Sequence, residues 1–116
     1  MRPMLRPAQS ALLRAIGQWL DIERKNRDLP ILRVESLTSE PWHSATFNGE
    51  RHNMSIRVEG VHAVSSAAFI AGRLGEAELI VPGQIVADVN LVRQETILDA
   101  CGAACLMAFE VLTVEE

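Results

Sequence analysis

The spacing of apolar residues predicts a helix near the start of the chain. From Pro7 to about Arg24, apolar side chains recur at helical spacing, at Ala8, Leu12, Ala15, Ile16, Trp19 and Leu20. Arg14 and Gln18 mark the side of this helix that we expect to face water. Pro7 suits the first turn, because the N–H that proline lacks has no partner there. We therefore predict an amphipathic helix that ends in a short polar turn before Pro30.

From Ile31 the apolar period changes to two, which is typical of strands. Residues 31–37 predict an imperfect strand that stops by Pro41. Residues 42–47 and 51–59 then flank Asn48-Gly49, a pair that strongly favours a tight hairpin turn. In the second arm, Met54, Ile56 and Val58 alternate with Ser55, Arg57 and Glu59. Three strands are thus predicted, the last two forming a hairpin.

Residues 60–74 predict a second helix that is unusually rich in alanine, serine and glycine. It is apolar most of the way round, so we expect it to be buried on more than one side. Two arrangements remain open from the residues alone. The helix lies either between the sheet and the first helix, or between the sheet and a second subunit.

The last third of the chain predicts three more strands. Residues 77–81 and 84–93 flank Pro82-Gly83, which suits a type II turn. Residues 96–104 are ambiguous between a short helix and a loop. Residues 106–114 have apolar side chains on both faces, which indicates a central strand.

These elements give the order α-β-β-β-α-β-β-β, which is an α+β fold. We expect one antiparallel-rich sheet of about five or six strands, with two main helices packed on a face. The 116 residues, 48% of them apolar and 22% charged, correspond to a single globular domain over residues 1–116.

Charge and hydropathy exclude two classes of partner. The formal net charge is −4, and the 11 basic residues are thinly spread, so we expect no nucleic-acid partner. No run reaches the roughly 18 apolar residues of a membrane-spanning helix, so we expect no membrane partner. Arg2, Arg6 and Arg14 precede the first acid, and we interpret this start as the opening helix rather than a targeting segment.

The two cysteines, Cys101 and Cys105, are too few for a disulfide-stapled secreted scaffold. Their neighbours are small and apolar, and no further ligand or cation lies close in sequence. We expect both to be buried small side chains in a reducing, cytoplasmic protein that carries no cofactor.

The hairpin holds the most interesting polar residues. A two-residue turn at Asn48-Gly49 would place Ala45 opposite His52, with His43 as a diagonal neighbour on the face that carries Glu50. Two imidazoles and a carboxylate would begin a divalent-metal or general-base site. A three-residue loop would instead place Trp42 opposite Met54 and put the two histidines on different faces.

Asp88 and Asn90 share one face of a predicted strand. If that face is buried, each needs a polar partner, and the pair becomes a candidate pocket floor. If it faces water, they are ordinary surface residues, which is the arrangement we expect.

Three functional hypotheses follow. The first is a non-catalytic module that self-associates, as a dimer in the simplest case, because the second helix and the last strand carry more apolar surface than one small sheet covers. The second is a small-molecule or metal-dependent enzyme that uses His43, Glu50, His52 and Asp88 in one pocket. The third is a regulatory module that binds an unidentified small molecule without chemistry.

Overall fold

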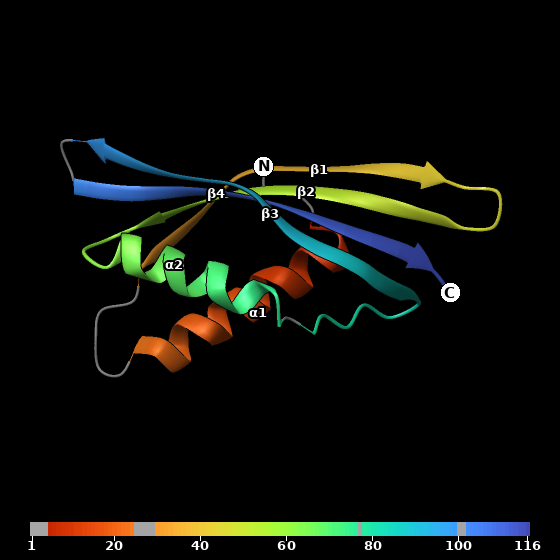
Figure 1. Ribbon diagram of the computed structural model, residues 1–116, viewed down its shortest axis with the longest axis horizontal. Coiled ribbons are helices and arrows are strands. Elements are labelled where there is room, and N and C mark those ends of the chain that lie inside the picture. The colour runs from red at the N-terminus through yellow and green to blue at the C-terminus, as the bar shows by residue number, and fades with distance from the viewer. Residues whose placement is uncertain (1–4, 25–29, 77, 100–101) are drawn as a thin grey trace.

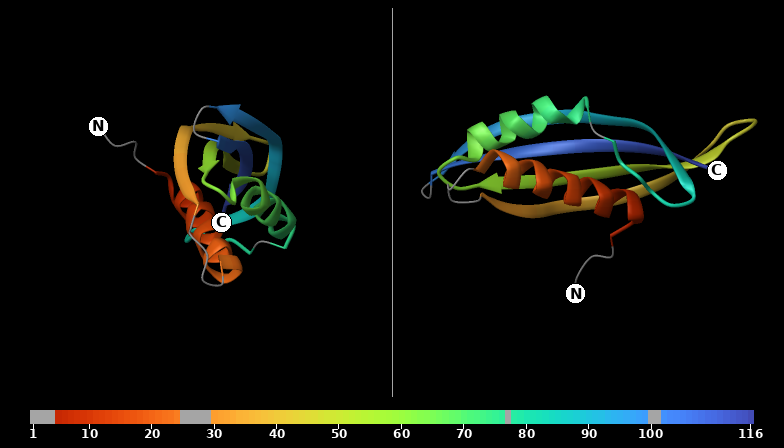
Figure 2. Two further views of the ribbon diagram at one scale, coloured as in Figure 1. Left: turned by 90° about the vertical axis from the view of Figure 1, so that its left-hand side faces the viewer. Right: turned by 90° about the horizontal axis from the view of Figure 1, so that it is seen from below.

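The chain folds into one antiparallel sheet with both helices on a single face (Figure 1). The structure is a computed structural model and describes residues 5–24, 30–76, 78–99 and 102–116. The elements are α1 (Pro7–Arg24), β1 (Ile31–His43), β2 (Asn48–Glu59), α2 (Ala63–Leu74), β3 (Gln84–Asp99) and β4 (Gly102–Glu115). The strands lie in the order β1-β2-β4-β3. We call the face of the sheet that the helices cover the inner face, and the opposite face the outer face (Figure 2).

Buried and partly exposed side chains alternate along the central strands β2 and β4, so the core lies between the inner face and the helices. The sheet contributes Met54, Ile56, Val58, Cys105, Met107, Phe109 and Val111, and the helices contribute Leu12, Ile16, Ala67 and Ile70. The predicted burial of Cys105 is thereby confirmed, whereas Cys101 lies outside the described residues. The predicted first helix and the central position of the last strand are also confirmed.

α2 contacts α1 and three strands, which corresponds to the first of the two arrangements that the residues left open. Its buried residues lie on one side, at Ala63, Ser66, Ala67, Ile70 and Leu74. Val64 on the same helix is exposed, so the expected burial on more than one side was an overestimate. The small side chains on the buried side let the helix lie close to the strands.

The sheet has four strands, not the five or six expected, because the first two predicted strands are one and residues 78–80 form none. β1 continues through Pro41, which pairs with Glu50. Proline lacks the N–H of a strand ladder, but β1 is an edge strand, where one side of the backbone needs no partner. The first half of the chain is therefore α-β-β.

The predicted hairpin exists, but its turn is not at Asn48-Gly49. His43 pairs with Asn48 and Trp42 with Gly49, so both residues of the expected turn belong to β2. Residues 44–47 form the loop instead. Its Ser44 Oγ accepts hydrogen bonds from the backbone N–H groups of Thr46 at 3.4 Å and Phe47 at 2.9 Å.

The second half of the chain also has fewer strands than predicted and the same order, α-β-β. Residues 78–80 form no strand, and Val81 makes only an isolated bridge to Gln84 across the turn at Pro82-Gly83. Gly83 there has φ of 77°, as a type II turn requires. The segment left open at 96–104 is neither helix nor loop over its described residues, because β3 extends to Asp99 and β4 begins at Gly102.

The two α-β-β halves meet along β2 and β4, where Ser55 pairs with Ala108. Each edge strand has a bulge at this level: Glu35 is the additional residue in β1, and Val92 is the additional residue in β3, which has a second bulge at Ala87. Because a bulge bends its strand, both edges of the sheet change direction at the same height.

Candidate functional site

A buried polar cluster joins α1 to the inner face of the sheet. Gln9 Nε2 donates to Ser39 Oγ at 3.3 Å and to the Thr38 carbonyl at 3.3 Å. Ser39 Oγ lies 2.8 Å from His52 Nδ1, and His52 Nε2 lies 3.4 Å from Thr113 Oγ1. These side chains come from four elements that are far apart in sequence.

The directions of these hydrogen bonds form one consistent chain. Ser39 Oγ accepts from Gln9, so its own hydroxyl proton is free to donate to His52 Nδ1. This order of donors requires the tautomer of His52 that carries its proton on Nε2, from which it donates to Thr113 Oγ1. Thr113 in turn donates to the Glu50 carbonyl at 3.4 Å. With a neutral imidazole, each side chain of the cluster therefore has a hydrogen-bond partner.

His52 is only 1% exposed, and burial lowers its pKa below the ordinary value. The Glu50 carboxylate opposes this effect by raising the pKa, and Arg6 adds a smaller lowering. A histidine that resists protonation when folded destabilises the native state in acid, because the unfolded chain takes up the proton first.

We expect the free energy of unfolding to fall as the pH drops through the ordinary histidine pKa of 6.5, and to level off below the lowered native pKa. Above about pH 7.5 both states are neutral at His52, and this contribution to the pH dependence vanishes. Urea denaturation at intervals from about pH 8 to about pH 5 measures the trend. His52→Asn removes the titration and should flatten the curve relative to the wild-type chain.

His43→Asn is the matched control, since it removes an exposed imidazole at the hairpin end. The control should follow the wild-type pH dependence. An identical slope for wild-type and His52→Asn would show that His52 does not resist protonation.

The four residues proposed for catalysis are not all brought together. Glu50 lies beside His52 on the inner side of β2. His43 lies at the end of β1 and is exposed. Its Nδ1 is 2.8 Å from Asn48 Oδ1. Asp88 is opposite Leu112 on the outer face of β3, where it accepts a hydrogen bond from Asn90 at 2.7 Å. Both outer-face residues are exposed, as expected for Asp88 and Asn90.

Both predicted hairpin registers are wrong. Ser39 lies opposite His52, in place of Ala45, and Leu37 lies opposite Met54, in place of Trp42. The partner that His52 acquires is therefore a serine hydroxyl, and His43 is four positions further along β1 than the residue opposite His52.

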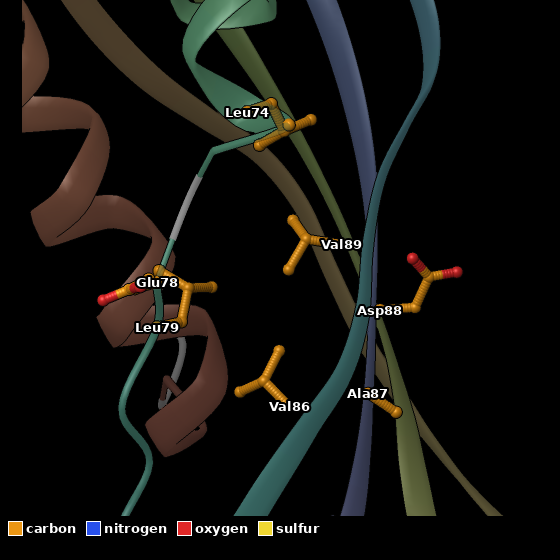
Figure 3. A pocket seen from close by; sticks show the side chains of 8 residues that line it. Leu74, Glu78, Leu79, Val86, Ala87, Asp88 and Val89 are labelled. Atoms are coloured by element: carbon orange, nitrogen blue, oxygen red, sulfur yellow. The ribbon is translucent and has the colours of Figure 1, made fainter.

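A cavity of about 500 Å³ lies between the end of α2, residues 78–79 and β3 (Figure 3). Leu74, Leu79, Val86 and Val89 point into it, whereas Asp88 points to the other side of β3. A second hollow, of about 350 Å³, lies on the outer face at the level of the two bulges, where Glu35, Arg57 and Arg93 contribute to its lining. The first cavity offers aliphatic contact.

Within the described ranges, no group of three or more histidine, cysteine, aspartate or glutamate side chains is arranged to hold a metal ion. Neither described helix is long and apolar enough to cross a membrane.

No protein-family model matches the chain, and no curated protein matches it in sequence. Among solved structures, the chain resembles one from the "virion of native gene transfer agent (GTA) particle", with a TM-score of 0.58 and 13% sequence identity. The match covers 97% of this chain and 100% of the other. The likeness is one of fold. It extends over both α-β-β halves, so the arrangement of two helices on a four-stranded sheet is shared as a whole.

Proposed function

We propose that this chain is a non-catalytic structural subunit that assembles with copies of itself in a larger protein particle. The observation that carries the proposal is the state of the sheet edges. Among the described strands, β1 pairs with β2 alone and β3 with β4 alone, so two long edges are open. An open edge presents backbone donors and acceptors that another strand can pair with.

The exposed apolar side chains support the same proposal, because five of the ten large ones among the described residues lie on these two strands and none lies on β2 or β4. Ile31 and Val34 are exposed on β1, and Ile85, Val92 and Leu98 are exposed on β3. Single exposed apolar residues are ordinary, but a concentration along both edges favours burial by a partner. The first sequence hypothesis placed the apolar excess on α2 and the last strand, so the location changes while the hypothesis is retained.

The structural neighbour supports a role within a particle. That chain belongs to the virion of a gene transfer agent, and its whole length shares this fold. A subunit of such a particle works by contact with other subunits. We therefore propose a place in a virion-like assembly for this chain, and a protein surface as its main partner.

The enzyme hypothesis receives less support from the geometry. It needs His43, Glu50, His52 and Asp88 in one pocket. Asp88, however, lies on the outer face, and His52 is buried on the inner face. A ligand-binding module would have the cavity beside β3, where Figure 3 shows no carboxylate directed inward, and the smaller hollow on the outer face.

Sedimentation velocity between about 1 and 100 μM tests self-association. We expect species heavier than the 12.8 kDa chain, with a proportion that rises with concentration. Val92→Lys should weaken the association at least tenfold, because Val92 is 59% exposed on an open edge. Val61→Lys is the matched control, since Val61 is 86% exposed but lies outside the strands. A 12.8 kDa species alone at every concentration would contradict the proposed function.

A further inference from the structure

We infer that copies of this chain join head to tail, with β1 of one copy pairing antiparallel to β3 of the next. The inference rests on the proposed function and assigns the surface through which assembly occurs. Its partner is a second copy of the same chain, bound through the two open strand edges.

Strand direction permits this contact without reorienting either copy. Neighbouring strands in the order β1-β2-β4-β3 are all antiparallel, so β1 and β4 run one way and β2 and β3 the other. When a second copy in a similar orientation brings its β1 beside β3, the alternation of directions continues. The result is a sheet that runs through both subunits.

The bulges select one register. If Arg33 of one copy lies opposite Glu95 of the other, the bulge residue Glu35 meets Arg93, directly beside the second bulge at Val92. Both strands then bend at the same height. Side chains keep to their faces on either side of the bulges: Ile31 meets Ile97 on the outer face, and Leu37 meets Leu91 on the inner face.

This register also pairs opposite charges at the centre of the contact. Arg33 faces Glu95, and Glu35 faces Arg93, so two cross-strand ion pairs form between copies. Within one copy, Arg33 contacts Glu59 and Arg93 contacts Glu95. These contacts are largely exposed and rearrange at little cost. One unfavourable pair, Glu40 opposite Asp88, lies at the end of the register.

The alternative contact, between two copies of β3 around Gln94, is shorter. It also places Arg93 opposite Glu95, but the bulge at Val92 interrupts it on both sides. Beyond the bulge, the inner-face Leu91 of one copy would oppose the outer-face Ile97 of the other. A side chain cannot pack against one on the opposite face, so the pairing stops there.

A head-to-tail contact has a different consequence from the dimer first expected. A joined pair still has one open β1 edge and one open β3 edge, at its two ends, so the assembly grows into a closed ring or an open filament.

Disulfide trapping tests the register. In a Cys101→Ser background, Thr38→Cys and Asn90→Cys place exposed thiols at positions that the inferred register sets opposite each other. Mild oxidation of the double variant should give a ladder of dimers, trimers and larger species on a non-reducing gel. Each single variant alone should remain uncrosslinked, and a mixture of the two singles should stop at dimers.

Thr38→Cys with Glu95→Cys is the off-register control. Position 95 is five residues from position 90, about 16 Å along a strand, which is beyond the reach of a disulfide. A ladder from the control, or a dimer from either single variant, would overturn the inferred pairing.

Charge exchange gives an independent test. R33E places two acids opposite each other and E95R places two bases, so each variant alone should associate at least tenfold more weakly. An equimolar mixture should recover assembly, because the acid introduced at position 33 of one variant then faces the base introduced at position 95 of the other. The remaining contact in the mixture pairs the unchanged Arg33 with the unchanged Glu95. Circular dichroism of each variant checks that the fold is unchanged.

The two proposals fail in distinguishable ways. If the wild-type chain assembles but the trapping and mixing experiments give no ladder and no recovery, the edge contact is wrong and the proposed function stands. If the wild-type chain sediments at 12.8 kDa throughout, both are wrong.

Discussion

Replacing Phe109 by alanine is expected to lower the free energy of unfolding by about 3–5 kcal/mol. Phe109 is 1% exposed, lies in the central strand β4 and pairs across the sheet with Met54 and Leu91. Its ring occupies the layer between the sheet and the helices, where three elements would have to move together to close the space. Because small domains are stable by only about 5–15 kcal/mol, urea denaturation should show a large fall in the midpoint.

Phe47→Ala is the matched control for this substitution. Phe47 lies in the loop between β1 and β2 and is 57% exposed. The same change of side chain should therefore alter the free energy of unfolding by less than about 1 kcal/mol. Equal losses in the two variants would show that Phe109 does not lie at the centre of the core.

The periodicity of the chain was sufficient to predict the helices and the α+β class. α1 has one apolar side with water-facing residues opposite, and this local pattern survives because the sheet covers only that side. The central position of β4 was also predictable, since both of its neighbours, β2 and β3, shield it. These features depend on spacing within one element.

The strand boundaries depended on contacts between elements and were predicted less well. Pro41 and the Asn48-Gly49 pair are both strong local signals for the end of a strand. Tertiary contacts override them: Trp42 pairs with Gly49, and its Nε1 donates to the Thr113 carbonyl at 3.2 Å. That donor-acceptor contact spans 71 residues, so no local pattern contains it.

Of the candidate site, the sequence identified His52 and its neighbour Glu50 but not the partners of the imidazole. Gln9 and Thr113 are polar residues at positions that the helical and strand periods assign to the buried side, and this mismatch is the signal that could have identified them. Their convergence required the register of β1 against β2, which the misplaced turn concealed. Asp88 was separated from them because β3 lies at the opposite edge of the sheet.

The same register predicts an unusually large effect at Gly49. A Cβ added there would overlap the Thr113 carbonyl oxygen and lie 2.8 Å from the indole nitrogen of Trp42. The first contact is with backbone in the central strand, which cannot move without breaking the β2–β4 ladder. Gly49→Ala is therefore expected to lower the free energy of unfolding by about 3 kcal/mol, at the upper end of ordinary overpacking.

Gly17→Ala separates this steric effect from the general properties of alanine. Gly17 lies within α1 and has no heavy atom within 4 Å of an added Cβ, so alanine there should stabilise the chain by about 0.5–1 kcal/mol. The two variants should thus differ in sign in parallel urea denaturations, with tryptophan fluorescence reporting the displacement of Trp42 in Gly49→Ala. A neutral result at Gly49 would mean that Asn48-Gly49 forms the turn after all, because only in the β2 register does the glycine meet the Thr113 backbone.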